Sequence, residues 1–320
     1  MSNGTKYYGG FFWVAAVSFI VPLFVGWQAF QNVQPATKPT PSLDKSGVDH
    51  NVWDYLLKNY VANGLVDYDG MKKDYLFYEY LRQLGTCDPQ LLDTDDDRLA
   101  LACNAYNAFV INGVISHKVD NSVMLVVEEK DSDDEDSDKE KPDDEDSDKE
   151  KEKPDGFFEF EEHVFAGQTI SLDQLEKEMI LPTFKEPRVH VALVCGAKGC
   201  PSIRPQAYLG QCVRDQLQDQ SALFVNDPKH VTYDPKANEL KLNSILSWYG
   251  NDFNERYPNG GYLTWISELA TDQTIKDAAI KAINKEVSVS FLDYDWALNA
   301  QARSKGGKVG GFGSGSSPDE

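Results

Sequence analysis

The sequence is poor in positive charge: 31 lysines and arginines stand against 52 aspartates and glutamates, which gives a formal net charge of −21. Proteins that bind DNA or RNA without regard to sequence need a basic surface, because their affinity comes from neutralised phosphates. The acidic balance excludes that class, and we expect no nucleic-acid partner. Much of the excess lies in residues 128–155, where 17 acidic residues stand against 6 lysines.

Several catalytic and cofactor-binding signatures are also missing. No serine-hydrolase or dinucleotide motif occurs, and the segment GAKGCPS at residues 196–202 lacks the Gly-Lys-Ser/Thr ending of a phosphate-binding loop. Cys195 and Cys200 do not have the two-residue spacing of the strongest zinc patterns, although His190 and His163 could add ligands. We therefore expect neither a metal nor a cofactor.

The acidic segment at residues 128–155 contains only Glu, Lys, Asp, Ser and Pro, and DDEDSDKEK at residues 133–141 recurs at residues 143–151. A stretch without hydrophobic side chains has no surface to bury, so we predict a disordered, solvated insert. Calcium binding is the alternative, but the glycine that turns an EF-hand loop is absent.

Residues 11–30, FFWVAAVSFIVPLFVGWQAF, form an apolar run without a charged side chain. A helix of this length spans about 30 Å, the thickness of the hydrocarbon core of a bilayer. Trp13 and Trp27 lie near the two ends, where such rings prefer the membrane interface. A cleaved signal peptide is the alternative, but no small residues follow the run at the spacing of a cleavage site. We predict an uncleaved transmembrane signal-anchor after the N-terminal tail, residues 1–10, in a single-pass membrane protein with an extracytoplasmic main domain.

The rest of the chain is predicted to form a linker at residues 31–47, one domain at residues 48–300 and a flexible glycine- and serine-rich tail at residues 301–320. Hydrophobic periodicity predicts helices at residues 49–60, 74–84, 95–117, 171–181, 211–225, 244–249 and 271–285. Alternating and β-branched runs predict strands within residues 156–170, at residues 189–194 and in a hairpin at residues 231–242. The expected fold is α+β: a single helix-rich domain with a small β-sheet that holds the 189–194 strand and the hairpin.

The predicted strand at residues 189–194 runs into a glycine-rich loop, CGAKGCPSIRP, which bears Cys195 and Cys200. Such a turn exposes a thiol and aims backbone N–H groups at it, as in a nucleophile site with an anion hole. His190 is the candidate base, although a regular strand would point it and Cys195 to opposite faces. The alternatives are a core histidine with buried thiols or a short disulfide. The five cysteines are an odd number, and the sequence does not fix their pairing.

The apolar helix predicted at residues 95–117 carries Asn104 and Asn107 on one face. A buried side-chain amide costs free energy unless it is paired, so both amides need partners. We expect them to contact the cysteine loop, either as orienting groups of a catalytic site or as structural ties. The candidate catalytic residues are therefore Cys195, His190, Asn104 and Asn107.

Five motifs, in this order, resemble those of the family named domain of unknown function 547. They are CNAYNAF (103–109), SLDQLEKEMI (171–180), PRVHVALVCGAKGCPSIRP (187–205), LSWYGNDF (246–253) and DYDWALN (293–299), and the resemblance is assigned to about residues 48–300. The resemblance emphasises Asn104, Tyr106, Asn107, Glu176, His190, Cys195, Cys200, Pro201, Trp248 and Tyr249. The chain departs from the pattern at Lys177, where the family usually has histidine, and at Pro182, where arginine is common.

Three functions fit these residues, and none of them names a substrate or a protein partner. The first is a thiol-dependent hydrolase or acyl transferase of the cell envelope, with Cys195 as nucleophile, His190 or another histidine as base and an asparagine as orienting group. The second is a non-catalytic, membrane-tethered binding or scaffold module with a structural cysteine loop. The third is a thiol-redox role, which the resemblance implies because some family members accompany glutaredoxin-like domains. A reactive, exposed thiolate at Cys195 would separate the enzymes from the scaffold.

Overall fold

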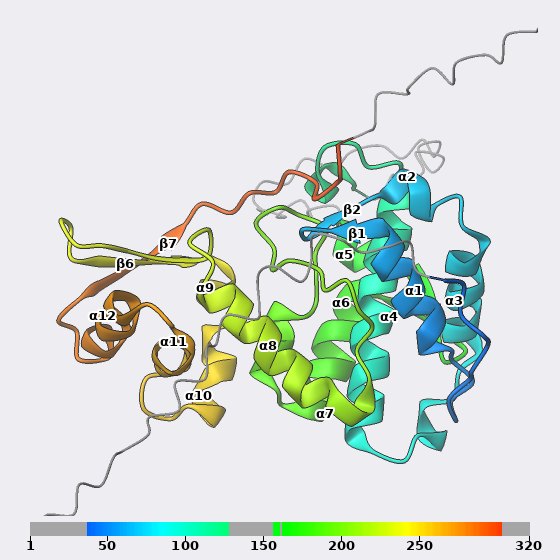
Figure 1. Ribbon diagram of the computed structural model, residues 1–320, viewed down its shortest axis with the longest axis horizontal. Helices are drawn as coiled ribbons and strands as arrows, with labels where there is room; N and C mark the ends of the chain where they lie inside the picture. The colour runs from blue at the N-terminus through cyan, green and yellow to red at the C-terminus, as the bar shows by residue number, and fades with distance from the viewer. Residues whose placement is uncertain (1–36, 128–155, 161, 303–320) are drawn as a thin grey trace, which may run out of the picture. The chain divides into compact units, whose positions relative to one another are not determined.

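The computed structural model describes residues 37–127, 156–160 and 162–302. The predicted anchor at residues 11–30, the acidic insert at residues 128–155 and the tail from residue 303 lie outside the described residues. The described chain is rich in helices and contains small β-sheets, which confirms the α+β class (Figure 1).

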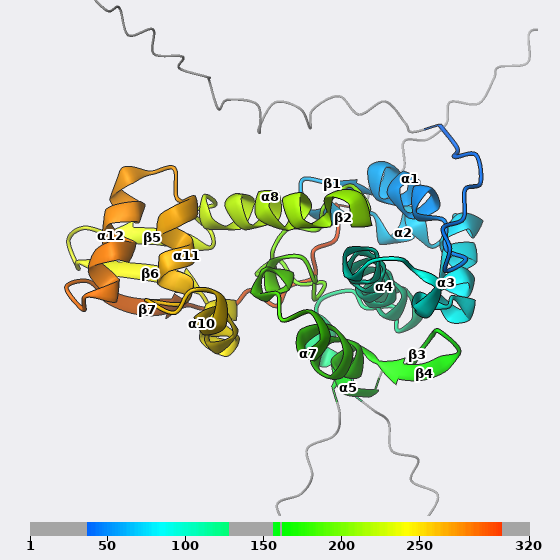
Figure 2. The same cartoon turned by 90° about the horizontal axis from the view of Figure 1, so that it is seen from below.

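The first part of the chain packs around one long helix. Before it come α1 (His50–Tyr60), the paired strands β1 (Val61–Ala62) and β2 (Leu65–Val66), α2 (Tyr68–Met71), α3 (Tyr75–Thr86) and η1 (Pro89–Leu91); the long helix itself is α4 (Asp95–Ser116), and η2 (Val123–Leu125) follows it. Thr94 caps α4 by accepting a hydrogen bond from the Asp97 backbone N–H. α4 contacts α2, α3, α6 and α8 and occupies the centre of these helices in Figure 2.

α4 is the one described helix that is long and apolar enough to cross a membrane, but 89% of its most apolar window is buried within the protein. Its apolar residues face neighbouring helices on nearly all sides, as is typical of the central helix of a core. The sequence prediction of a buried central helix is therefore confirmed.

After the insert, α5 (Phe157–Phe160) is followed by the antiparallel strands β3 (Glu162–Phe165) and β4 (Gln168–Ser171). The next helical segment comprises α6 (Leu172–Gln174), the π-helical η3 (Leu175–Ile180) and α7 (Leu181–Phe184). Ser171 caps it as predicted, and Gln174 completes a capping box. The expected helix at residues 171–181 is thus present, but its centre is wound more widely than an α-helix, which is a frequent feature of functional sites.

The predicted strand at residues 189–194 is wrong, because this segment forms the short 3₁₀ helix η4 (Pro187–Val191) and a following turn. Proline sets the helical φ at the first position, and the Glu186 side chain accepts a hydrogen bond from the Arg188 backbone N–H. The buried Asn107 amide then binds the Val194 N–H and the Ala192 carbonyl, the groups that a neighbouring strand would otherwise have paired.

The C-terminal part begins with η5 (Gly210–Cys212) and α8 (Val213–Val225) and contains the predicted hairpin of β5 (Val231–Asp234) and β6 (Glu239–Asn243). Short helices follow, α9 (Ile245–Trp248), η6 (Gly250–Asp252), α10 (Phe253–Arg256), α11 (Tyr262–Leu269) and α12 (Gln273–Ile283), and then β7 (Ser288–Leu292). β7 pairs parallel to β6, so the sheet has the order β5-β6-β7 and does not include residues 189–194. α12 packs on this sheet beside α11 (Figure 2).

Two apolar clusters meet at η4. Val189 belongs to the cluster around α4, whereas Val191 belongs to the cluster formed by the sheet, α11 and α12. His190 lies between these two valines, so the backbone that carries it is held where the two clusters join. The core therefore fixes the position of one candidate site residue from both sides.

Candidate functional site

The cysteine loop is held between α4 and the chain segment at residues 293–299. Gly196 has a φ of +76°, and a Cβ atom there would lie 3.6 Å from side-chain atoms of Val110 and Val114. A Cβ atom on Gly199 would lie 2.8 Å from the backbone nitrogen of Asp295, so no side chain fits at this position. The two glycines thus allow the loop to pass closely between the helix and the 293–299 segment.

The two asparagines of α4 have different partners. Asn107 donates from Nδ2 to the Ala192 carbonyl over 3.0 Å and accepts from the Val194 N–H over 2.9 Å. Asn104 instead exchanges two hydrogen bonds, of 2.8 and 2.9 Å, with the backbone of Tyr208, and its Nδ2 lies 3.2 Å from His50 Nδ1. Asn107 therefore supports the chain that enters the cysteine loop and Asn104 the chain that follows it, so the amide hydrogen bonds hold the two ends of the loop and not the loop residues themselves, as had been expected.

Cys195 and Cys200 are both free and lie side by side. The Cys195 backbone N–H donates to Cys200 Sγ over 2.9 Å, and Cys195 Sγ lies 3.1 Å from Tyr294 Oη. Cys195 is half-buried and Cys200 is buried. As a whole residue, Cys195 is therefore less enclosed than Cys200.

The surroundings shift the pKa values of the two thiols in opposite directions. Burial raises the pKa of Cys195, but hydrogen bonds from the Cys200 thiol, the Tyr294 hydroxyl and the backbone of Ala197 outweigh it, so the pKa lies below the ordinary value. Burial raises the pKa of Cys200 well above its ordinary value, and its hydrogen bond to Cys195 adds to this effect. Cys195 is therefore the more acidic thiol of the pair and Cys200 the less acidic one.

His190 belongs to a second polar cluster. Its Nε2 lies 2.7 Å from Asp252 Oδ2, its Nδ1 lies 3.8 Å from Glu176 Oε1, and its ring stacks on Tyr249 with centroids 4.1 Å apart. The Tyr106 hydroxyl donates to the other Glu176 oxygen over 3.1 Å. No hydrogen bond joins His190 to Cys195 in the part of the chain that the structure describes, so the predicted base is paired elsewhere.

The two clusters are nevertheless neighbours. Burial raises the pKa of Tyr106 far above its ordinary value, and the charges of Glu176 and Cys195 both add to that increase. Burial also raises the pKa of Glu176, which the nearby His190 and the Tyr106 hydroxyl only partly offset. The Glu176 side chain thus binds its proton more tightly than a carboxyl group in water.

Sequence reasoning from residue types did not find two of these groups. Tyr294 and Asp252 lie in the motifs DYDWALN and LSWYGNDF, which were noted only for their family resemblance. Tyr294 also contacts Trp248 and Trp296, with ring centroids 4.9 and 4.6 Å away, and Trp248 is 50% exposed. These aromatic residues are visible in the sequence, but their spacing follows no helical or strand period. The sequence therefore did not indicate that they gather at the surface beside a thiol.

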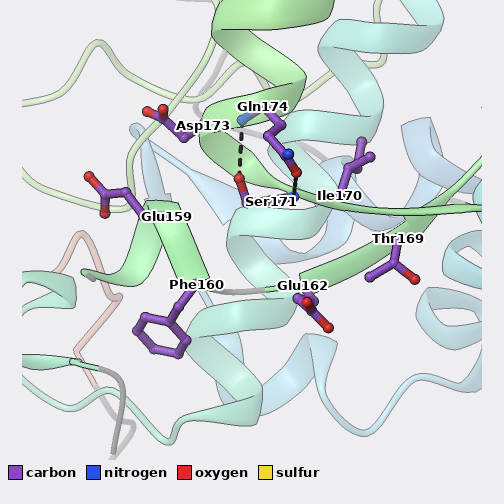
Figure 3. Close-up of a pocket in the computed structure, with 8 residues that line it drawn as sticks. All are labelled: Glu159, Phe160, Glu162, Thr169, Ile170, Ser171, Asp173 and Gln174. Atoms are coloured by element: carbon purple, nitrogen blue, oxygen red, sulfur yellow. Dashed lines mark hydrogen bonds between the residues drawn. The ribbon is translucent and has the colours of Figure 1, made fainter. Parts of the chain in front are cut away.

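Among the described residues, one cavity lies beside α5 and another beside the cysteine loop. The larger, of about 430 Å³, lies between β4, α5 and α6 and is lined by Glu159, Phe160, Glu162, Thr169, Ile170, Ser171, Asp173 and Gln174 (Figure 3). None of these residues belongs to the cysteine loop, and Figure 3 shows Ser171 and Gln174 bonded to each other in the helix cap. The smaller cavity, of about 300 Å³, includes Cys200 in its wall. Within the described ranges, no three His, Cys, Asp or Glu side chains are grouped as a metal site.

The fold and the site define a helix-rich α+β domain in which a buried helix supports a loop with two adjacent free thiols. Residues 89–225 match the model of the family described as Protein of unknown function, DUF547, which confirms the predicted resemblance over this range. The matched range contains Asn104, Asn107, His190, Cys195 and Cys200, whereas the motifs at residues 246–253 and 293–299 lie outside it. No curated protein and no solved structure matches the chain.

Proposed function

We propose that this domain is a thiol–disulfide exchange module in which Cys195 is the attacking thiol and Cys200 the resolving thiol. The observation that carries the proposal is the opposite shift of the two thiol pKa values within one hydrogen-bonded pair. A lowered pKa increases the fraction of Cys195 that is thiolate at a given pH, and the thiolate is the reactive form. A raised pKa keeps Cys200 protonated until the first step has taken place.

The exchange balances in two steps. The Cys195 thiolate attacks one sulfur of a substrate disulfide, forms a mixed disulfide with it and releases the first substrate thiolate. Cys200 then gives up its proton to that leaving thiolate and attacks the Cys195 sulfur, which releases the second substrate thiolate. The substrate disulfide is reduced, Cys195 and Cys200 are oxidised to a disulfide, and a second dithiol must return the pair to its reduced form.

A thiol-dependent hydrolase or acyl transferase would share the Cys195 nucleophile but would need a base for proton transfer. The sequence offered His190 for this role, and the contacts of His190 with Asp252 and Glu176 do not support it. The group nearest to the Cys195 sulfur is instead a second thiol together with the Tyr294 hydroxyl. This neighbourhood favours disulfide exchange over acyl transfer.

The proposed setting is the outer face of a membrane. Residues 11–30 supply an anchor of sufficient length and apolarity, and residues 31–47 supply a spacer with three prolines. Outside the cytoplasm, substrate disulfides form and persist, which suits a module that exchanges them. The membrane is therefore the partner we propose for the N-terminal segment.

The proposal is tested by the pH dependence of cysteine alkylation. Full-length protein in detergent is treated with iodoacetamide across a pH series, and the modified positions are identified by peptide mass spectrometry. We expect Cys195 to react first, with a midpoint below that of an ordinary thiol, and Cys195→Ser to remove this reaction. Cys212, which is half-buried and outside the pair, provides the internal reference. A Cys195 that titrates at or above the Cys212 midpoint would refute the proposal.

A further inference from the structure

The cavity beside Cys200 is assembled from segments that are far apart in the sequence. Its wall includes Gly64 of the β1–β2 turn, the loop from residues 197–202, His230 before β5, Asn243 at the end of β6 and Asp293 after β7. Its volume of about 300 Å³ lies at the lower end of the range of small-molecule sites. The cavity thus has room for a small ligand against Cys200, the proposed resolving thiol, whose sulfur accepts a hydrogen bond from the backbone N–H of the attacking Cys195.

Asn243 determines which ring nitrogen of His230 carries the proton. The Asn243 amide accepts from the Ile245 N–H over 3.0 Å and donates to the Gly199 carbonyl over 2.9 Å, so its nitrogen is the atom that faces His230. That nitrogen donates to His230 Nδ1 over 2.8 Å. Burial lowers the pKa of His230 to about 3, so the ring is neutral, and its proton must be on Nε2.

His230 therefore offers one N–H donor that the protein does not use. His230 is 2% exposed and lines the cavity, and its Nε2 has no hydrogen-bond partner in the described part of the chain. Nε2 is not one of the fully enclosed side-chain nitrogens that lack a partner, so it is open to the cavity, where a ligand or a water molecule can accept from it. The complementary ligand group is an oxygen acceptor.

Two charged side chains of the cavity wall, one of each sign, form neither a hydrogen bond nor an ion pair among the described residues. Lys198 lies on the cysteine loop and Asp293 lies at the end of β7, and both are exposed side chains that line the cavity. The other two charged residues of the wall are engaged: Lys229 bonds Ser202 over 3.4 Å, and Asp295 accepts from the Ala297 N–H over 3.0 Å. A ligand that carries both a carboxylate and an ammonium group would pair with Lys198 and Asp293 together.

We infer that the cavity is a recognition site for an amino-acid-type disulfide, whose carboxylate meets His230 Nε2 and Lys198 and whose ammonium group meets Asp293. This inference rests on the proposed exchange function and adds the class of its substrate. The net charge of −21 favours a different order of substrates, because an acidic protein attracts cationic disulfides more strongly than zwitterionic ones. A preference for a zwitterion over a cation would therefore have to come from the cavity.

The test compares four small aliphatic disulfides of different charge: cystine (zwitterionic), cystamine (cationic), dithiodipropionate (anionic) and bis(hydroxyethyl) disulfide (neutral). The second-order rate constant for oxidation of the reduced full-length protein is measured with each. We expect cystine to react about tenfold faster than the neutral and cationic compounds, the gain of one well-placed ionic hydrogen bond. Equal rates for cystine and the neutral compound would overturn the inference.

Two substitutions assign the preference to the cavity. Lys198→Gln should slow cystine and dithiodipropionate about three- to fivefold and leave the other two unchanged, because it removes an exposed cation. Asp293→Asn should slow cystine and cystamine only. Lys236→Gln, at an exposed position in the β5–β6 turn, is the matched control and should change none of the rates. If Lys198→Gln lowers the rate constants for all four compounds by the same factor, the inference is overturned.

If none of the four disulfides reacts, the proposed exchange function has failed, and a binding measurement decides the inference separately. In the Cys195→Ser/Cys200→Ser double variant, nitrogen chemical shifts of the His230 ring are followed while cystine is added. A saturable shift of the Nε2 resonance supports an amino-acid site in the cavity. An unchanged resonance at saturating cystine overturns it.

Discussion

Cys195 and His190 are five residues apart in the sequence, but they belong to two polar clusters that are built in opposite ways. Around Cys195, donors from Cys200, Tyr294 and the backbone stabilise a negative charge and lower the pKa of the thiol. Around Glu176, burial outweighs the partners and raises the pKa of the carboxyl. The comparison shows that burial alone does not decide charge: the number of donors aimed at the group does.

The largest effect that would test this contrast is on the reactivity of Cys195. Cys200→Ala removes the thiol that donates to Cys195, so the pKa of Cys195 should rise and alkylation near neutral pH should slow about tenfold. His190→Phe should leave the alkylation rate nearly unchanged, because His190 is bonded to Asp252 and not to the thiol. If His190→Phe slows alkylation as much as Cys200→Ala does, the two clusters are one site.

A large effect on stability is expected at the amide that supports the cysteine loop. Asn107→Leu leaves the Val194 N–H and the Ala192 carbonyl buried without partners, and we expect the free energy of unfolding to fall by about 2–4 kcal/mol. Urea denaturation measures this, and Asn51→Leu, at an exposed position on α1, is the control. A loss no larger than that of Asn51→Leu would show that the loop does not depend on α4.

A smaller effect is expected in the second cluster, on the pH dependence of stability that Glu176 causes. Because the pKa of Glu176 is raised above its ordinary value of 4.5, the folded state holds this proton more tightly than the unfolded state does. The stability from Glu176 is therefore fully present below pH 4.5 and is lost as the pH rises through the folded-state pKa. Glu176→Gln should flatten the decline of the unfolding free energy with rising pH, and an unchanged slope would contradict the assignment.

The smallest effect is expected at Lys177, where the resembled family usually has histidine. Lys177 forms an ion pair of 2.5 Å with Asp173 one turn earlier, and its side chain is 53% exposed. Lys177→His should change the free energy of unfolding by about 0.5 kcal/mol or less, because exposed pairs of this kind contribute little. A substantially larger change, or a change in Cys195 alkylation, would connect this position to the site.

The sequence predicted the features that depend on local pattern. The buried helix of Asn104 and Asn107, the Ser171 cap and the 231–242 hairpin follow from apolar spacing and turn chemistry, and the structure contains all three. It did not predict η4, because Val189 and Val191 satisfy the pattern of a buried strand equally well. The outcome there was decided by the Asn107 amide, which lies more than 80 residues away in the sequence.

The candidate site was predicted only in part, because some of its contacts also join residues that are far apart in the sequence. Cys195 and Cys200 stand out as cysteines in a glycine-rich loop, and the structure brings them together. The pairing of His190 with Asp252 and of Cys195 with Tyr294 joins residues 62 and 99 positions apart, and no local period relates such positions. His190 and Cys195 were the candidate catalytic pair even though a five-residue spacing places two side chains on opposite faces of a strand. In the structure a 3₁₀ helix and a turn separate them, and the two side chains have different partners.

The most direct test of the central claim is the product of a single exchange reaction. Reduced full-length protein is mixed with a small aliphatic disulfide, the released thiol is counted, and disulfide-linked peptides are mapped by mass spectrometry. The account predicts two thiols released per protein and a Cys195–Cys200 disulfide, with a mixed disulfide trapped at Cys195 in the Cys200→Ala variant. One thiol released with a stable mixed disulfide at Cys195 in the wild-type protein would contradict it, as would a reaction that begins at Cys200.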